Sequence, residues 1–186
     1  EVPNQIIEQA NKLLKIEKKI NALEARLNSS KEQEGFGDKS PSKTELSKLL
    51  EYFQAGHHND AEKLALSLID KFPKHQFSWK VLGAIFGLTD RKSEAVNANK
   101  KAIALFPRDA EAHCNLANAF QDLGKLVEAE ASYKKAIAIR PAFAEAHYNL
   151  GTMLQELDRL EESEACYKQA VLFKPDFAEV YNNLGN

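Results

Sequence analysis

Apolar and small residues recur with a period of 34 positions from residue 42 to the end of the chain. Proline closes each period, because it has no backbone N–H to donate and cannot continue a helix. The positions that share the period form a proline set, a small-residue set and a large apolar set: Pro73, Pro107, Pro141 and Pro175; Ala61, Ala95, Ala129 and Ser163; Tyr52, Phe86, Phe120 and Leu154. The pattern predicts repeated units of two antiparallel helices.

Three segments carry the same order of large and small residues in the first helix of a unit: WKVLGAIF from Trp79, HCNLANAF from His113 and HYNLGTML from His147. This order resembles the tetratricopeptide repeat (TPR), a helix–turn–helix unit. Gly83 and Gly151 match the small residue at which its two helices meet. The resemblance implies an all-α fold, a right-handed TPR α-solenoid of helix-turn-helix repeats, because one unit cannot bury its apolar face alone.

The period divides the chain after residue 41 into five units. We expect a degenerate first repeat that caps the array, three complete repeats, and the first half-helix of a truncated fifth repeat: residues 42–75; 76–109, 110–143 and 144–177; and 178–186. In the first repeat, Lys48 and Leu49 replace the leucine and the small residue of the pattern, as is common in a terminal repeat. The half-helix has no partner helix, so we expect the intact protein to continue beyond Asn186.

Residues 1–28 follow a seven-residue spacing instead. This spacing predicts an amphipathic helix similar to a short coiled coil. Its apolar seam consists of six residues: Ile6, Leu13, Ile16, Ile20, Leu23 and Leu27. Three interpretations stay open, namely that the helix self-associates as an oligomerisation helix, docks on the chain's own solenoid, or forms only with a partner. Residues 29–41 are rich in serine, glycine and charge, and we expect a flexible linker there.

Asn115, Asn149 and Asn183 occupy one position of three successive first helices. Their equal spacing predicts a ladder of amides along the inner, concave surface of the solenoid. An amide offers both donors and an acceptor, so it can pair with the N–H and C=O of an extended peptide. The ladder is similar to that of O-linked N-acetylglucosamine (O-GlcNAc) transferases, whose repeats also read N-L-G. The other candidates for this peptide-binding groove are Asn118, Gln121, Tyr148, Thr152, Gln155, Asn182 and Asn186.

The ladder does not extend through the first two repeats, where Ser47 and Val81 stand at its position. We therefore expect a ligand to lie mainly against the third repeat and those after it. Lys80 is the one obvious cation of the groove, and its acidic residues are Glu111, Asp122, Glu145, Glu156 and Glu179. TPR proteins that clamp a C-terminal carboxylate use converging lysine and arginine, whereas an acidic groove repels an acidic tail. The expected partner is a neutral or weakly basic extended segment of a protein or peptide.

Composition narrows the remaining possibilities. The formal net charge of −2 favours no nucleic acid partner, and no apolar run is long enough for membrane insertion, so we expect a cytoplasmic protein. Cys114 and Cys166 are far apart in the sequence and are expected to be reduced thiols. His113 and His147 share a packing position of the repeat, and we find no metal-ligand spacing, cofactor motif or catalytic motif.

These features predict a non-catalytic protein-protein interaction module that is part of a longer protein. Two alternatives stay open. The repeats also resemble bacterial TPR arrays that precede transferase domains, so this chain could be the substrate-presenting N-terminal region of a TPR-fused glycosyltransferase or sulfotransferase. A catalytic domain would then lie beyond residue 186. In the second alternative the chain is a self-assembling scaffold, a homo-oligomer joined through the N-terminal helix or the half-repeat end.

Overall fold

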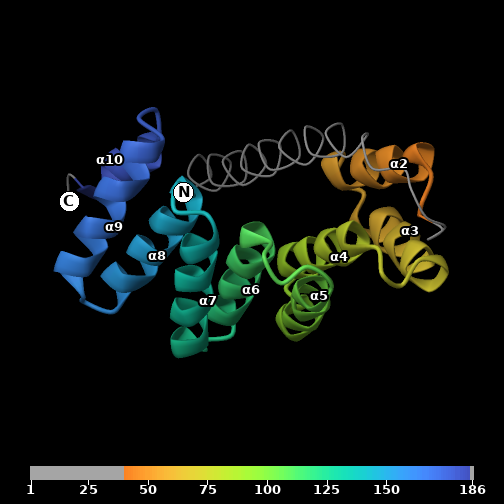
Figure 1. Ribbon diagram of the computed structural model, residues 1–186, viewed down its shortest axis with the longest axis horizontal. Coiled ribbons are helices and arrows are strands. Elements are labelled where there is room, and N and C mark those ends of the chain that lie inside the picture. The colour runs from red at the N-terminus through yellow and green to blue at the C-terminus, as the bar shows by residue number, and fades with distance from the viewer. Residues whose placement is uncertain (1–39, 185–186) are drawn as a thin grey trace, which may run out of the picture. The chain divides into compact units, whose positions relative to one another are not determined.

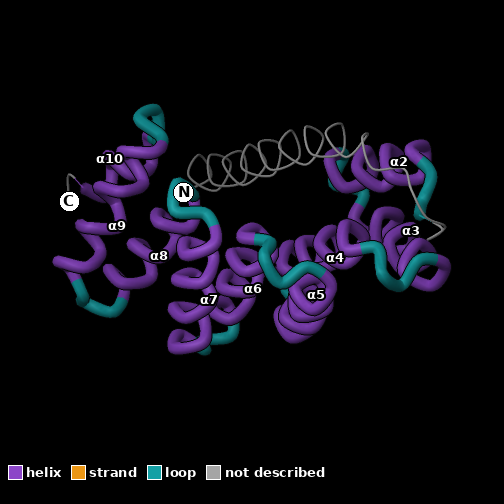
Figure 2. Tube along the Cα trace, in the orientation of Figure 1, coloured by secondary structure: helices purple, strands orange, loops and turns teal. Residues whose placement is uncertain are grey.

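The computed structural model describes residues 40–184, and in that range the chain forms nine α-helices and no β-strand (Figures 1 and 2). The predicted all-α fold is therefore confirmed for this part of the chain. No helix within it is long and apolar enough to cross a membrane. The N-terminal helix expected over residues 1–28 lies outside the described residues, as do most of the linker and Asn186. The chain divides into two compact units, residues 1–73 and residues 74–186.

The described part of the first unit is a pair of packed helices, α2 (Lys43–Gln54) and α3 (His58–Lys71). A capping box starts α2: the Ser42 hydroxyl accepts the N–H of Glu45 at 3.2 Å, and the Glu45 carboxylate accepts the N–H of Ser42 at 2.9 Å. The hydrogen bonds from Ser42 lower the pKa of Glu45. Leu49, which replaces the small residue of the repeat, is fully buried, so this pair packs around a large side chain.

The second unit is a stack of helix pairs. Its described helices follow one another in chain order: α4 (Gln76–Leu88), α5 (Lys92–Leu105), α6 (Ala110–Asp122), α7 (Leu126–Ile139), α8 (Ala144–Glu156), α9 (Leu160–Phe173) and α10 (Ala178–Leu184). Each first helix packs against its own second helix, and each second helix packs against the next first helix. The first helices α4, α6 and α8 also contact one another in order. This arrangement is the predicted TPR-type α-solenoid.

Small residues allow the two helices of a repeat to approach closely. A Cβ atom added to Gly83 would lie 2.7 Å from Oδ1 of Asn99 on the facing helix. A Cβ atom added to Gly151 would lie 2.8 Å from the Tyr167 ring. Ordinary van der Waals contact begins several tenths of an ångström farther out, so a Cβ atom at either glycine would require the facing side chain to shift. The third repeat accommodates Ala117 at this position, opposite Tyr133.

The turns within the repeats of the second unit share one backbone feature. Asp90, Gly124 and Asp158 stand at the same repeat position, and all three have left-handed φ angles of 58°, 70° and 57°. Glycine adopts this conformation at no steric cost, and aspartate tolerates it better than most residues. A left-handed residue therefore ends the first helix and directs the chain into the second.

Candidate functional site

The first helices of the second unit present one continuous side, which we call the first-helix face. It is the side of α4, α6, α8 and α10 that carries Val81, Asn115, Asn149 and Asn183 at one repeat position. The three asparagines are partly exposed, whereas Val81 is buried. The structure thus places the predicted amides at equivalent points of three successive helices.

Two of these amides are oriented by hydrogen bonds to the preceding repeat. The Asn149 amide donates to Oδ1 of Asn118 at 3.2 Å, and the Asn183 amide donates to the hydroxyl of Tyr167 at 3.1 Å. The Asn149 amide also donates to the sulfur of Cys114 at 3.9 Å. An amide has two N–H donors and a carbonyl that can accept two hydrogen bonds, so these internal bonds leave capacity for a ligand. The rotamers of these side chains are therefore set before a ligand binds.

A buried tyrosine hydroxyl lies behind the face in each of the third and fourth repeats. The Tyr133 hydroxyl is 2.6 Å from Oδ1 of Asn118 and 2.9 Å from Oε1 of Gln121. Burial raises the pKa of Tyr133 far above its usual value, so the hydroxyl keeps its proton and can donate. Asn118 thus accepts from Tyr133 and from Asn149, which joins the third repeat to the fourth.

The fourth repeat contains the equivalent arrangement. The Tyr167 hydroxyl lies 2.8 Å from Oε1 of Gln155 and 3.3 Å from Oγ1 of Thr152, and it accepts from Asn183. Tyr148 adds an aromatic surface, since its ring centroid is 6.0 Å from that of Tyr167. Burial raises the pKa of Tyr148 as well. Six of the predicted groove residues are therefore gathered around two tyrosines: Asn118, Gln121 and Asn149 at Tyr133; Thr152, Gln155 and Asn183 at Tyr167.

The second repeat lacks this polar arrangement. Asn99 stands where the later repeats have Tyr133 and Tyr167, and the facing positions carry Ala84 and Gly87. The Asn99 side chain is 2% exposed, and its Oδ1 has no hydrogen-bond partner among the described residues. The tyrosine-centred hydrogen bonds of the first-helix face therefore start at α6.

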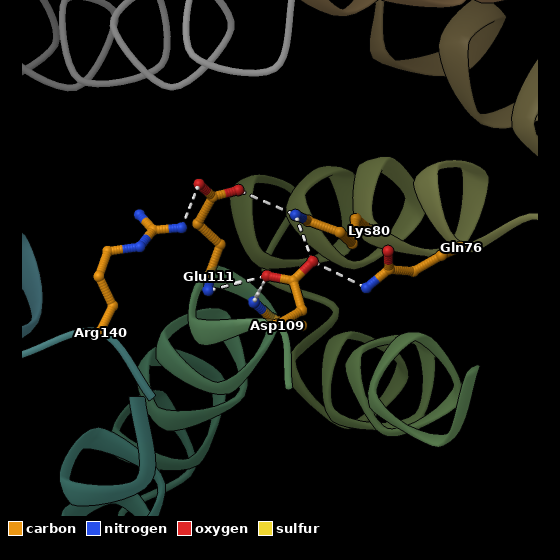
Figure 3. A network of polar contacts seen from close by, with 6 residues as sticks. Gln76, Lys80, Asp109, Glu111 and Arg140 are labelled. Atoms are coloured by element: carbon orange, nitrogen blue, oxygen red, sulfur yellow. Dashed lines mark hydrogen bonds and ion pairs between the residues drawn. The ribbon is translucent and has the colours of Figure 1, made fainter. Parts of the chain in front are cut away.

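A network of charged side chains joins α4 to α6 instead (Figure 3). Nζ of Lys80 lies 3.0 Å from Oδ2 of Asp109 and 2.9 Å from Oε2 of Glu111. The Gln76 amide donates to Asp109 at 2.8 Å, and Arg140 donates to Glu111 at 3.2 Å. Figure 3 shows Gln76 and Lys80 projecting from one helix, with Arg140 on the other side of Glu111. Lys80, the cation predicted for the groove, is thus paired twice within the protein.

Asp109 also caps α6, because its Oδ1 accepts the N–H groups of Glu111 at 2.9 Å and Ala112 at 3.2 Å. Burial by itself would raise the pKa of Asp109. The ion pair with Lys80 and the hydrogen bonds from Ala112 and Gln76 outweigh burial and hold that pKa below its usual value. Asp109 therefore stays ionised at neutral pH and keeps Lys80 in place.

The remaining predicted residues contribute less to this site. Asn182 is exposed beside Asn183 on α10. Glu145 and Glu179 are partly exposed, and Glu156 accepts from Gln121 at 3.4 Å. Asn186 and the residues predicted for the oligomerisation helix lie outside the described range: Ile6, Leu13, Ile16, Ile20, Leu23 and Leu27.

The two histidines of the repeat are structural. Nε2 of His113 lies 3.0 Å from the carbonyl oxygen of Pro107, and Nε2 of His147 lies 2.8 Å from that of Pro141. Each histidine thus ties a first helix to the proline that ends the preceding repeat. Among the described residues, no cluster of three or more histidine, cysteine, aspartate or glutamate side chains could hold a metal ion.

Sequence reasoning missed three members of the charged network: Gln76, Asp109 and Arg140. One signal in the sequence could have found Asp109, because the same position in the next two repeats is Phe143 and Phe177. A carboxylate in place of a phenylalanine marks a change in what joins the repeats at that point.

Comparisons with known proteins agree with the fold. Family models described as tetratricopeptide repeat match residues 98–131 and 144–177, and one described as TPR repeat matches residues 118–158. Residues 98–177 therefore contain tetratricopeptide repeats. No curated protein matches the chain. The matches support TPR repeats in general, and not the finer similarity to O-GlcNAc transferases.

Solved structures show the same architecture. A crystal structure of MamA has a TM-score of 0.67 and 23% identity, and the alignment covers 88% of this chain and 91% of that one. TTC0263, a TPR protein of Thermus thermophilus, also has a TM-score of 0.67 and 23% identity, over 73% and 75% of the two chains. The first TPR of Spaghetti (RPAP3), bound to the HSP90 peptide SRMEEVD, has a TM-score of 0.56 and 24% identity, over 59% and 86%. At these identities, the similarity describes the fold.

Proposed function

We propose that the first-helix face of α6, α8 and α10 binds an extended peptide segment of a partner protein. The TPR fold generally mediates protein-protein interaction, and the TPR of RPAP3 is itself bound to a peptide. The observation that carries the proposal is the set of amides at Asn115, Asn149 and Asn183, two of which are oriented by hydrogen bonds. Side-chain amides at a regular interval suit a peptide backbone, which repeats its donors and acceptors.

The charges of the face favour a neutral or weakly basic segment. Lys80 is bound to Asp109 and Glu111, so it offers little attraction to an incoming carboxylate. Glu145 and Glu179 are partly exposed on the same face and repel acidic ligands. We therefore expect this chain to bind an acidic peptide such as SRMEEVD poorly.

An array of immobilised extended peptides of graded net charge tests this proposal. The unmodified chain should bind neutral and basic peptides more tightly than acidic ones. In the triple variant Asn115/Asn149/Asn183→Ala, each lost hydrogen bond should cost roughly 0.5–1.5 kcal/mol, or about 2- to 13-fold in affinity. The exposed Asn59 and Asn97 lie off this face, and their double Ala variant serves as the matched control. Unchanged binding by a folded triple variant would refute the role of the amides.

Peptide binding, the proposed role, requires no catalysis, and TPR-repeat proteins are typically non-catalytic scaffolds. The substrate-presenting role beside a transferase domain and assembly through the N-terminal helix or the half-repeat end stay predictions. Localisation in the cytoplasm stays a prediction too.

A further inference from the structure

A hollow of about 370 Å³ lies between α7 and α9, away from the first-helix face. The apolar residues that line it come from three helices: Ile137 and Ala138 from α7, Leu150 from α8, and Ala165 and Cys166 from α9. Lys134, His147 and Gln169 also border it, but most of its exposed surface is apolar. An apolar lining stabilises bound water poorly, because the lining offers few hydrogen-bond partners. The hollow is therefore a place where an apolar side chain of another molecule would be stabilised.

An exposed apolar side chain lies on the same helix as the hollow. Leu172 is 66% exposed on α9 and falls seven residues after Ala165, so both lie on one side of that helix. On α7, Val127 is 81% exposed. Exposed apolar groups next to an apolar depression are a common property of surfaces that bind another protein.

The charges along α7 and α9 indicate which molecule could bind the face that these two helices form. The first half of α7 contains Glu128 and Glu130, and its second half contains Lys134 and Lys135. Lys134 pairs with Glu130 at 2.7 Å within the chain, as Lys168 pairs with Glu164 on α9, so each helix carries an ion pair with its acidic member nearer the start of the helix. On α9, three glutamates, at positions 161, 162 and 164, likewise precede Lys168. A second copy of this face, turned so that its helices run antiparallel, would place acidic halves on basic halves. A parallel arrangement would place like charges together.

The spacing on α9 fits the same arrangement. Leu172 and Ala165 are about 10 Å apart along a helix that rises 1.5 Å per residue. A two-fold axis passing midway between them places Leu172 of each copy opposite Ala165 of the other, at the hollow. Such an interface is isologous, since each copy contributes both Leu172 and the hollow that receives Leu172 of the other copy.

We propose that the face formed by α7 and α9 binds a second copy of this chain, with the helices antiparallel and Leu172 of each copy seated in the hollow of the other. This surface differs from the first-helix face, so a peptide and a second copy can be bound at once. It also differs from the N-terminal helix, for which self-association is one of three open interpretations.

Cross-linking through Cys166 tests the proposal on the full chain. Cys166 lines the hollow, whereas Cys114 is buried in the core. A flexible bismaleimide should join two chains through Cys166. The covalent dimer should persist in Cys114→Ser and disappear in Cys166→Ser. Absence of a dimer at concentrations at which sedimentation shows self-association would overturn the proposal.

Sedimentation of a charged variant supplies the second measurement. Leu172→Glu places a carboxylate against the partner's apolar hollow and should weaken self-association at least tenfold and abolish the Cys166 cross-link. Leu66→Glu is the matched control, because Leu66 is 46% exposed on α3, and it should change neither. Circular dichroism verifies that both variants are folded. A folded Leu172→Glu variant that cross-links like the unmodified chain would exclude this interface, as would an unmodified chain that stays monomeric.

Discussion

The charged network between α4 and α6 makes a strong prediction about stability. Replacing Lys80 by methionine keeps much of the side-chain length and removes the charge. Asp109 and Glu111 then lose their shared cation, although Arg140 stays 3.2 Å from Glu111. We expect Lys80→Met to destabilise the second unit because it leaves a largely buried carboxylate without its cation.

The size of the effect follows from burial. The Lys80 and Asp109 side chains are 6% and 10% exposed. Removing one partner of a fully buried ion pair costs about 3–5 kcal/mol. Here Asp109 keeps the hydrogen bonds from Gln76 and from the start of α6, so we expect a loss of roughly 2–3 kcal/mol.

The pH dependence distinguishes this explanation from lost packing. In the unmodified chain the folded-state pKa of Asp109 is lowered, so its contribution is present above the unfolded pKa of about 3.9 and is lost as pH falls through the folded value. Without Lys80, burial opposes ionisation and the folded pKa of Asp109 rises. Protonation then stabilises the variant, and the difference between the two proteins should narrow from pH 7 towards pH 4.

Urea unfolding at both pH values measures this difference, with circular dichroism for the helices and the fluorescence of Trp79, the single tryptophan, for α4. Lys92→Met is the matched control. Lys92 lies 3.3 Å from Asp90 in an exposed pair, and its replacement should cost no more than about 1 kcal/mol at either pH. Equal stability of Lys80→Met and the unmodified chain, or a deficit that does not change with pH, would refute the reasoning.

Two further substitutions test the packing and the tyrosine hydrogen bonds. Gly151→Ala should destabilise the fourth repeat by about 1 kcal/mol, because its Cβ would lie 2.8 Å from the Tyr167 ring and that ring must shift, whereas Gly87→Ala meets nothing within 4 Å and should be neutral or stabilising. Thermal unfolding of the two variants measures the contrast, and an equal response would contradict it. Tyr133→Phe removes the hydroxyl near Asn118 and should cost about 0.5–1.5 kcal/mol; urea unfolding that detects no loss would show that this hydrogen bond contributes little.

The fold could be predicted from sequence because small and large residues recur at fixed positions of the repeat. Gly83 and Gly151 are small for a steric reason that acts within one repeat, so the reason appears at a fixed position. The prolines likewise act locally on the backbone. Such local constraints produce a periodic pattern in the sequence, and this pattern can be recognised without a structure.

The hydrogen bonds of the site could be predicted only in part. The amides of Asn115, Asn149 and Asn183 were visible because they share a position. The hydrogen-bonding role of Tyr133 could not be predicted from sequence. Its ring suggests packing, and its hydroxyl donates to Asn118 on another helix. The partners of Lys80 could be predicted in part: Glu111 is among the predicted residues of the groove, whereas Asp109, at a position that later repeats fill with phenylalanine, is not.

The repeats of the second unit are therefore joined in two chemically different ways. From the third repeat onward, neutral hydrogen bonds at Tyr133 and Tyr167 join each repeat to the next, and burial keeps the Tyr133 hydroxyl protonated over the whole ordinary pH range. Between the second and third repeats, Asn99 replaces the tyrosine, and Lys80 and Asp109 supply an ion pair. The third and fourth repeats also share an ion pair, in which Arg159 contacts Glu130 at 2.6 Å, and hydrogen bonds from Arg159 and Lys134 lower the pKa of Glu130 to about 2. The two ion pairs depend on carboxylates that titrate in acid, whereas the tyrosine hydrogen bonds do not. Acid strong enough to protonate Asp109 should therefore weaken the contact between α4 and α6, while the hydrogen bonds at Tyr133 and Tyr167, beside the proposed amide ladder, persist.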